Sequence, residues 1–188
     1  MRKLKLQMQV TLDGFVGGPD GEMDWMIFDW DDVIKNYVID LIDSSDTILM
    51  GRKMSDEFVS FWTSVLEDPT NPEHAFAKKM IDTPKVVFTK TLQSSPWPNT
   101  VLAKNNIVEE VNRLKNQIGK DIIVYGGAGF VSSLIMEDLI DEYNFFINPT
   151  AIGRGMTIFG KLGDKNSSLK LYRSQSYNCG IVVNTYLK

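Results

Sequence analysis

The chain opens with an alternation of apolar and polar residues. From Lys3 to Leu12 every second position is apolar, and this period of two predicts a half-buried β-strand. From Asp31 to Leu41 the apolar residues recur at intervals of three and four. That spacing predicts an amphipathic helix, with the carboxylates of Asp31 and Asp32 at its positive N-terminal end.

The same patterns predict the remaining elements. Short apolar runs predict strands at 47–50, 85–89, 100–102 and 122–125, and late strands at 142–147, 169–172 and 180–187. Helices are predicted to start near 55–57, to span 75–81 and 108–118, and to run from the glycines at 126–129 to Leu139. Gly119 is expected to close the third of these helices.

Strands and helices alternate along most of the chain, and the last part contains strands alone. This order predicts an α/β fold with one domain spanning residues 1–188, in which a mostly parallel sheet carries helices on both faces and ends in an antiparallel pair. The loops at 13–21, 51–57 and 126–130 would leave strands at the carboxyl edge of the sheet. Ligands of such sheets bind at that edge, so we expect a nucleotide site there.

Composition narrows the classes of function. The 188 residues carry a net charge of −4 with a pI near 5.0, which argues against a nucleic-acid-binding surface. The single Cys179 excludes an internal disulfide and a multi-cysteine zinc site. The single His74 disfavours a Ser-His-Asp triad or a histidine-rich metal centre, and its polar surroundings predict a solvated loop position. We expect no metal site.

The N-terminal segment MRKLKLQMQV lacks the continuous apolar core of an export signal. No apolar stretch is long enough to cross a bilayer. We therefore expect a cytoplasmic protein with no membrane partner.

The glycines after Tyr125 predict a phosphate-binding loop, because glycine lets a ligand approach main-chain N–H groups at the start of a helix. The fit to a dinucleotide fingerprint is partial: Gly127 and Gly129 match, whereas Ser132 occupies the third small position. No Gly-Lys-Ser/Thr follows, which excludes a P-loop. An ordinary Rossmann site is disfavoured as well, because no strand about twenty positions later ends in an acidic residue that could bind a ribose.

Four motifs in order resemble the dihydrofolate reductase-like superfamily, and most closely the C-terminal reductase domain of bacterial riboflavin biosynthesis. They are Leu12–Gly17, Gly51–Met54, Val124–Ala128, and a closing pattern made of Leu139–Tyr143, Asn148-Pro149, Gly153-Arg154-Gly155 and Phe159. The resemblance covers nearly the whole chain. It implies an eight-stranded, mostly parallel sheet with one antiparallel strand, an NADPH cofactor, hydride transfer to a pterin-like or pyrimidine-like ring, and a homodimer formed through the late strands.

The resemblance also implies which residues hold the cofactor. The implied set is Val16, Gly17, Gly51, Arg52, Lys53, Met54, Thr89, Lys90, Gly126, Gly127, Ala128, Gly129, Phe130 and Val131. Arg52, Lys53 and Lys90 would supply positive charge to phosphate groups. Residues 128–131 would offer backbone N–H groups to the pyrophosphate. In dihydrofolate reductases a cis peptide joins the pair that matches Gly126 and Gly127.

The proton donor is not fixed by the sequence. Aligning Trp25 with the tryptophan of the family puts Trp30 where dihydrofolate reductases have a buried acid, so Asp29 and Asp31 are the nearby candidates. The alternative for Asp31 is helix capping. Asp13 is a third candidate, also on the substrate side, and its alternative is a turn residue.

Aromatic residues could form a wall for a flat heteroaromatic substrate, with Trp25 and Trp30 as the substrate-binding candidates, or could simply be core. The other members of this group are Phe28, Phe58, Phe61 and Trp62.

The leading hypothesis is an NADPH-dependent reductase similar to 5-amino-6-(5-phosphoribosylamino)uracil reductase, acting on a small heteroaromatic molecule. One alternative is dihydrofolate reductase activity, and the other is a non-catalytic NADPH-binding regulatory module. The riboflavin step as the sole role is disfavoured, because no deaminase domain with zinc ligands precedes the reductase-like part.

Overall fold

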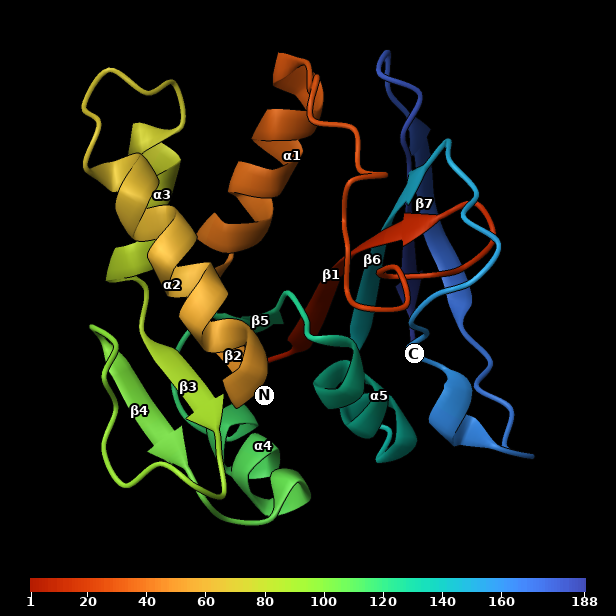
Figure 1. Cartoon of the computed structure of the whole chain (residues 1–188). Coiled ribbons are helices and arrows are strands. Elements are labelled where there is room, and N and C mark those ends of the chain that lie inside the picture. The colour runs from red at the N-terminus through yellow and green to blue at the C-terminus, as the bar shows by residue number, and fades with distance from the viewer.

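A computed structural model describes all 188 residues of the chain (Figure 1). Its helices are α1 (Asp32–Asp43), α2 (Arg52–Leu66), α3 (His74–Asp82), α4 (Ile107–Lys115), α5 (Ala128–Met136) and the 3₁₀ turn η1 (Gly160–Leu162). Its strands are β1 (Leu4–Thr11), β2 (Ser45–Gly51), β3 (Lys85–Phe88), β4 (Thr100–Ala103), β5 (Asp121–Val124), β6 (Glu142–Asn148), β7 (Lys170–Ser176) and β8 (Val182–Leu187).

The eight strands form one sheet in the order β4-β3-β2-β5-β1-β6-β8-β7. The six strands from β4 to β6 pair in parallel, whereas β8 pairs antiparallel with both β6 and β7. This arrangement confirms the α/β fold with a mostly parallel sheet and an antiparallel C-terminal pair. It also matches the single antiparallel strand that the resemblance implies.

Helices cover both faces of the sheet, as expected, and each face has its own apolar core. On one face Leu6 and Val124 pack with Leu134 of α5, and on the other Ile123 packs with Ile34 of α1. In Figure 1, α1 and α3 lie in the upper part of the view and α4 and α5 in the lower part, and the first turn of α2 reaches down toward α4 and α5. The fold is therefore a three-layer sandwich with the sheet in the middle.

The central position of β1 corrects one expectation. The alternation between Lys3 and Leu12 predicted a strand with one exposed face, but β1 lies between β5 and β6, and its polar residues Lys5 and Gln7 are buried as well. Helices on the second face cover these side chains. The alternation of apolar and polar residues shows that one face of the strand is polar. It does not show whether that face is exposed to solvent.

Several boundaries differ from the expected ones. Helix α2 begins at Arg52, ahead of 55–57, because Gly51 occupies its N-cap position. Helix α4 ends at Lys115 and is followed by Asn116 as C-cap, so Gly119 lies beyond the helix and does not close it. Helix α5 ends at Met136, ahead of Leu139. His74 is the half-buried first residue of α3 and not a loop residue.

Two buried lysines stabilise the layers through specific partners. The Nζ of Lys115 lies 2.5 Å from a carboxylate oxygen of Asp141 and donates to the carbonyl of Leu139. The Nζ of Lys85 donates to the carbonyls of Ile81 and Thr83. Burial lowers the pKa of Lys85 to about 8, against a weaker opposing effect of the Asp82 charge.

No helix of the structure combines the length and the apolar character needed to cross a membrane. No group of three or more His, Cys, Asp or Glu side chains is arranged to hold a metal ion.

Candidate cofactor and substrate site

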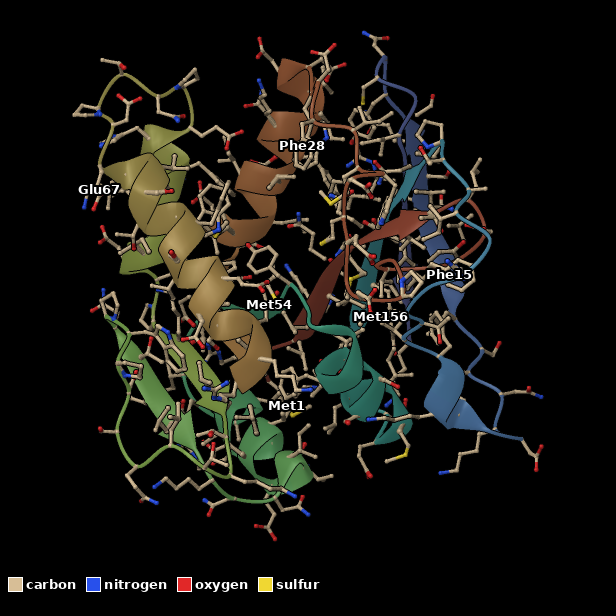
Figure 2. All side chains as sticks on the ribbon, in the orientation of Figure 1. Met1, Phe15, Phe28, Met54, Glu67 and Met156 are labelled. Carbon is tan, nitrogen blue, oxygen red and sulfur yellow. The ribbon has the colours of Figure 1, made fainter.

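Two helices that begin after a glycine, and so lack a side-chain cap, meet at the carboxyl edge of the sheet. Strands β2 and β5 are neighbours, and each runs through glycine directly into a helix, α2 after Gly51 and α5 after Gly127. A Cβ on Gly51 would lie 2.8 Å from Cβ of Phe130 on α5, and one on Gly126 would lie 3.1 Å from the Met54 sulfur. Figure 2 shows Met54 on the first turn of α2, beside the segment that leads into α5. The missing side chains let the two helix N-termini approach each other.

The start of α5 leaves backbone donors available. Gly127 supplies no side-chain cap, whereas Asp31 caps α1 and Asn106 caps α4 with side-chain oxygens. The N–H groups of Ala128 and Gly129 donate to no acceptor within the chain. An uncapped helix N-terminus of this kind attracts anions through its N–H groups and its dipole.

The same geometry corrects the expectation for the next two residues. The N–H groups of Phe130 and Val131 both donate to the carbonyl of Gly127, at 3.0 Å. Two of the four expected amides are thus used within the helix and are not free for a pyrophosphate. The peptide bond between Gly126 and Gly127 is cis, as the resemblance implied.

Positive side chains stand beside these helix starts. Gly51 pairs with Phe88 across β2 and β3, so Arg52 and Thr89 follow at the same edge. Arg52 is 45% exposed and its only ion pair is a 3.9 Å contact with Asp56 one turn on. Lys53 and Lys90 are exposed. The three cations are therefore available to an anionic ligand.

The buried Thr89 has a different task from the cations. Its hydroxyl accepts hydrogen bonds from the N–H groups of Thr91 and Leu92, both at 3.2 Å. Thr89 thereby shapes the turn that carries Lys90.

The first loop of the chain is tied to a distant segment. Val16 donates its N–H to Met156 at 2.9 Å, and Met156 donates to Gly17 at 2.8 Å, forming a short antiparallel bridge. A Cβ on Gly155 would lie 2.2 Å from the carbonyl oxygen of Gly17, so only glycine fits there. Figure 2 shows Phe15 and Met156 together on this side of the sheet. Gly155 was part of the motif that resembles the family, but the sequence did not predict its contact with Gly17.

Asp13 fastens the same two segments. Its carboxylate accepts from the hydroxyl of Thr11 at 2.6 Å and from the N–H groups of Ile152 and Gly153 at 3.1 and 2.6 Å. The hydrogen bond from Thr11, aided by those from Gly153 and Ile152, holds the pKa of Asp13 below its usual value. A carboxylate with these partners stays ionised near neutral pH, which suits a positioning role better than proton donation.

The other two carboxylates are arranged separately. Asp31 accepts hydrogen bonds from the N–H groups of Val33 and Ile34, both at 3.0 Å, and so caps α1. Asp29 is exposed and has no hydrogen-bond partner in the chain. The structure therefore does not assemble Asp13, Asp29 and Asp31 into one cluster.

The two tryptophans anchor the loop that precedes α1. Trp25 is buried and its indole N–H donates to the carbonyl of Glu22 at 3.1 Å. Trp30 donates to the carbonyl of Ile27 at 2.7 Å and stacks on Phe146 of the sheet, with ring centroids 6.0 Å apart. Both indole N–H groups are thus satisfied within the loop. Trp25 belongs to the apolar core and offers little surface to a substrate, whereas Trp30 is half-buried.

Sequence reasoning missed two polar side chains on the face that α1 and α2 cover. The amide oxygen of Gln7 and the hydroxyl of Tyr125 are buried and make no hydrogen bond. Buried polar atoms in proteins are nearly always paired, so each exception calls for an explanation. The available signal was a glutamine in the middle of an otherwise core-forming strand.

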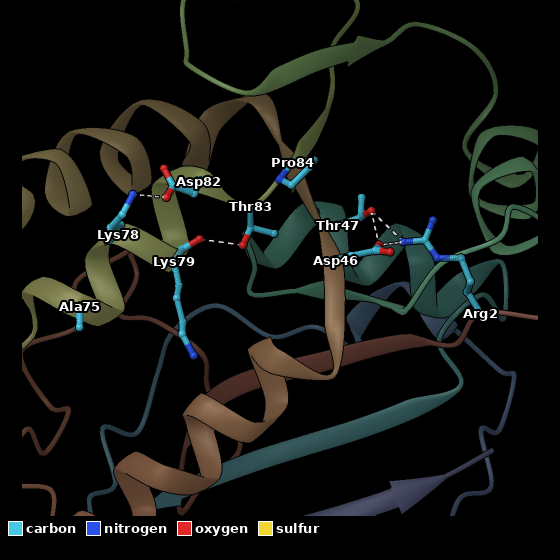
Figure 3. A pocket seen from close by; sticks show the side chains of 9 residues that line it. All are labelled: Arg2, Asp46, Thr47, Ala75, Lys78, Lys79, Asp82, Thr83 and Pro84. Atoms are coloured by element: carbon cyan, nitrogen blue, oxygen red, sulfur yellow. Dashed lines mark hydrogen bonds and ion pairs between the residues drawn. The ribbon is translucent and has the colours of Figure 1, made fainter.

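The opposite edge of the sheet carries a cavity of about 760 Å³ (Figure 3). It lies at the amino ends of β2 and β3, with Thr47 and Pro84 in its wall. Its charged groups are already paired with acidic partners. The pairs are Arg2 with Asp46, Lys78 with Asp82, and Lys79 with Asp43. Ligands of open α/β sheets bind at the carboxyl ends of the strands, so this cavity is not the candidate site.

The sheet order and the two helix starts preceded by glycine together define a protein of the dihydrofolate reductase-like class. Within that class, the chain belongs to the RibD C-terminal domain family, which it matches over residues 2–183.

Two related proteins align with most of the length of this chain. YyaP of Bacillus subtilis (strain 168) is 35% identical over 188 residues, covering 98% of this chain and 94% of YyaP. YwjB of the same organism is 28% identical over 161 residues, covering 86% of this chain and 84% of YwjB.

Two solved structures share the fold. A protein of Shewanella sp. PV-4 described as a riboflavin biosynthesis protein superposes with a TM-score of 0.71 at 23% identity, covering 100% of this chain and 98% of its own. The diaminohydroxyphosphoribosylaminopyrimidine deaminase/5-amino-6-(5-phosphoribosylamino)uracil reductase of Thermotoga maritima also gives 0.71, at 18% identity. This chain is covered to 99% and the Thermotoga protein to 56%, so the match leaves much of the bifunctional protein unmatched. Membership of the family supports a reductase-like role connected with riboflavin biosynthesis.

Proposed function

We propose that the protein is an NADPH-dependent reductase that transfers hydride to a pterin-like, pyrimidine or ribosylamine substrate. The observation that carries the proposal is the meeting of two uncapped, glycine-preceded helix N-termini at the carboxyl edge, with three available cations beside them. A dinucleotide with an additional phosphate has the size and charge that such an edge accommodates.

The residues present fit this cofactor. The amides of Ala128 and Gly129 would bind the pyrophosphate, since nothing in the chain uses them. Arg52, Lys53 and Lys90 would bind the additional phosphate that distinguishes NADPH from NADH. When bound there, NADPH would supply a hydride to the substrate.

The remaining residues would orient the substrate and keep water away. Phe58 stacks on Tyr125 directly before the glycine pair, with ring centroids 5.8 Å apart. A flat heterocycle beside these rings would lie next to the cofactor edge. The substrate in the name of the Thermotoga protein, 5-amino-6-(5-phosphoribosylamino)uracil, contains a heterocycle of this kind.

A second candidate is a non-catalytic NADPH-binding module. It is favoured by one observation: the carboxylates of Asp13 and Asp31 are both committed to backbone N–H groups, and Asp29 is exposed. Purified protein that binds NADPH but oxidises none of it with dihydrofolate, pterins or pyrimidine ribosylamines would support this candidate against the reductase.

Calorimetry with NADPH and NADH tests the cofactor. We expect NADPH to bind more tightly, and Arg52→Gln to weaken NADPH binding about tenfold with little effect on NADH, since a hydrogen bond to a charged group contributes about 1.5–3 kcal/mol. The matched control is Lys78→Gln, an exposed cation at the opposite edge. Equal affinity of the unmodified protein for both cofactors would contradict the proposal.

We also propose a homodimer formed through the C-terminal strands. Strand β7 is an edge strand and nearly all of it is exposed, including Leu171 and Tyr172 at 52% and 71%. An exposed edge of this length pairs readily with another chain. Sedimentation should give twice the mass of the chain, and Leu171→Lys should shift it toward the monomer, whereas an unmodified protein that sediments as a monomer would refute the dimer.

A further inference from the structure

Gln7 and Tyr125 lie side by side on the sheet. Strands β1 and β5 pair in parallel with Leu6 opposite Val124, which places the next residues, Gln7 and Tyr125, at the same level. Leu6 and Val124 face the α5 core. Because successive residues of a strand face opposite sides, Gln7 and Tyr125 both point toward the layer of α1 and α2.

The neighbours of Gln7 cannot satisfy it. On the other side of β1, Asn144 stands opposite Gln7. The amide oxygen of Asn144 accepts from the hydroxyls of Tyr37 at 2.7 Å and Thr185 at 2.9 Å, and its amide nitrogen donates to the carbonyl of Leu6 at 3.3 Å. The side chain of Asn144 is fully engaged. The side chain of Gln7 makes no hydrogen bond and its amide oxygen is buried, with only 8% of the residue exposed.

Tyr125 is fixed in place yet lacks a partner for its hydroxyl. Its ring stacks on Phe58 of α2, and it immediately precedes Gly126 at the start of the cofactor loop. Burial raises the pKa of the Tyr125 hydroxyl well above its usual range. The hydroxyl therefore keeps its proton, which makes it a lasting hydrogen-bond donor and a poor acid.

The chemistry of the pair defines what would satisfy it. A carboxamide offers one acceptor and one donor side by side, the pattern complementary to a carbonyl next to a ring N–H. Uracils and pterins both carry such a lactam edge. Because the side chain of Gln7 makes no hydrogen bond in the free protein, it can turn toward a ligand without breaking one.

We propose that Gln7 and Tyr125 recognise the lactam edge of the heterocyclic substrate, Gln7 through paired hydrogen bonds and Tyr125 by donating to the ring carbonyl. This assignment rests on the proposed reductase function and specifies the substrate side of the same site. A site that hydrogen-bonds a substrate group in this way discriminates strongly against analogues that lack the group.

Binding of diaminouracil to the protein saturated with NADP⁺, measured by calorimetry, tests the assignment. We expect Tyr125→Phe and Gln7→Met each to weaken binding about tenfold, because each removes one or two hydrogen bonds to a buried ligand group. Diaminouracil methylated on both ring nitrogens should bind the unmodified protein about tenfold more weakly than diaminouracil itself. The Gln7→Met variant should bind the two compounds with equal affinity. NADPH affinity should stay unchanged in both variants.

Thermal unfolding separates recognition from a structural role. Removing an unpaired hydroxyl should leave the melting temperature of the free protein unchanged or higher in Tyr125→Phe. The matched control is Tyr37→Phe, which removes a hydroxyl bonded to Asn144 and Thr185 and should lower it.

Three results would overturn the assignment: a drop in melting temperature for Tyr125→Phe equal to that for Tyr37→Phe, unchanged diaminouracil affinity in the Gln7 and Tyr125 variants, or no diaminouracil binding at all. If the unmodified protein still bound NADPH, the cofactor part of the proposed function would survive each of them. Absence of NADPH binding would instead refute the proposed function itself.

Discussion

The approach of α2 to α5 predicts that adding one methyl group at Gly51 will destabilise the protein. In Gly51→Ala the new Cβ would lie 2.8 Å from Cβ of Phe130. Contacting carbon atoms are ordinarily about 3.5–4.0 Å apart, so the new methyl would be about 0.7–1.2 Å too close. Rotation of the phenylalanine ring cannot relieve this contact, because its Cβ is fixed to the backbone of α5.

The magnitude follows from the balance of two terms. Overpacking of this kind costs about 1–3 kcal/mol, and the reduced freedom of the unfolded chain returns about 0.4–1 kcal/mol. The backbone at Gly51 has φ −82° and ψ 146°, which alanine adopts without strain, so the contact with Phe130 accounts for the loss. We expect a net loss of about 1–2 kcal/mol and a melting temperature about 2–8 °C lower.

Gly129→Ala is the matched control. Gly129 lies in α5, and a Cβ there would meet nothing within 4 Å. Alanine in a helix is more stable than glycine by about 0.5–1 kcal/mol, so this variant should melt at a higher temperature. Thermal unfolding followed by circular dichroism measures both variants. Equal or higher stability of Gly51→Ala would show that the helix starts are not as close as described, and the argument for a joint phosphate site would fail.

Three further predictions concern stability and the first loop. Lys115→Met should lower the free energy of unfolding by about 2–4 kcal/mol in urea titrations, because it leaves Asp141 without its buried partner. A loss below about 0.5 kcal/mol, which is what a solvent-exposed ion pair contributes, would contradict this prediction. The lowered pKa of Lys85 means that the folded chain binds fewer protons than the unfolded chain between pH 8 and pH 10.5, so unfolding free energy should rise over that interval relative to Lys85→Met. A constant difference between the two proteins would refute that pKa. Asp13→Asn should accelerate hydrogen exchange of the amides at 152–153, which mass spectrometry or NMR would detect, and should change KM more than kcat if the carboxylate positions the loop. A loss confined to kcat would indicate a catalytic carboxylate instead.

The types and order of the elements could be predicted because local periodicity determines them. The alternation from Lys3 to Leu12 predicts a strand without reference to the rest of the chain. The spacing after Asp31 likewise predicts a helix, and Asp31 itself is the N-cap residue. The glycines at 51 and 126–129 indicated the edge at which a ligand would bind. These inferences needed only neighbours within a few residues.

The parts that could not be predicted depend on contacts between distant residues. Nothing local to Asp13 indicates that its carboxylate binds amides at 152–153. Nothing near Gln7 shows that β1 is covered on both faces, or that Tyr125 stands beside it. The free amides at Ala128 and Gly129 became distinguishable from the bonded ones at Phe130 only once the start of α5 was known.

The bridge between Gly17 and Met156 has a consequence for how this edge can move. The two residues belong to loops far apart in the sequence, yet Met156 donates to the carbonyl of Gly17 and accepts from the N–H of Val16, and Gly155 lies against the same carbonyl. Opening the first loop for a ligand must therefore carry the later segment with it as one body.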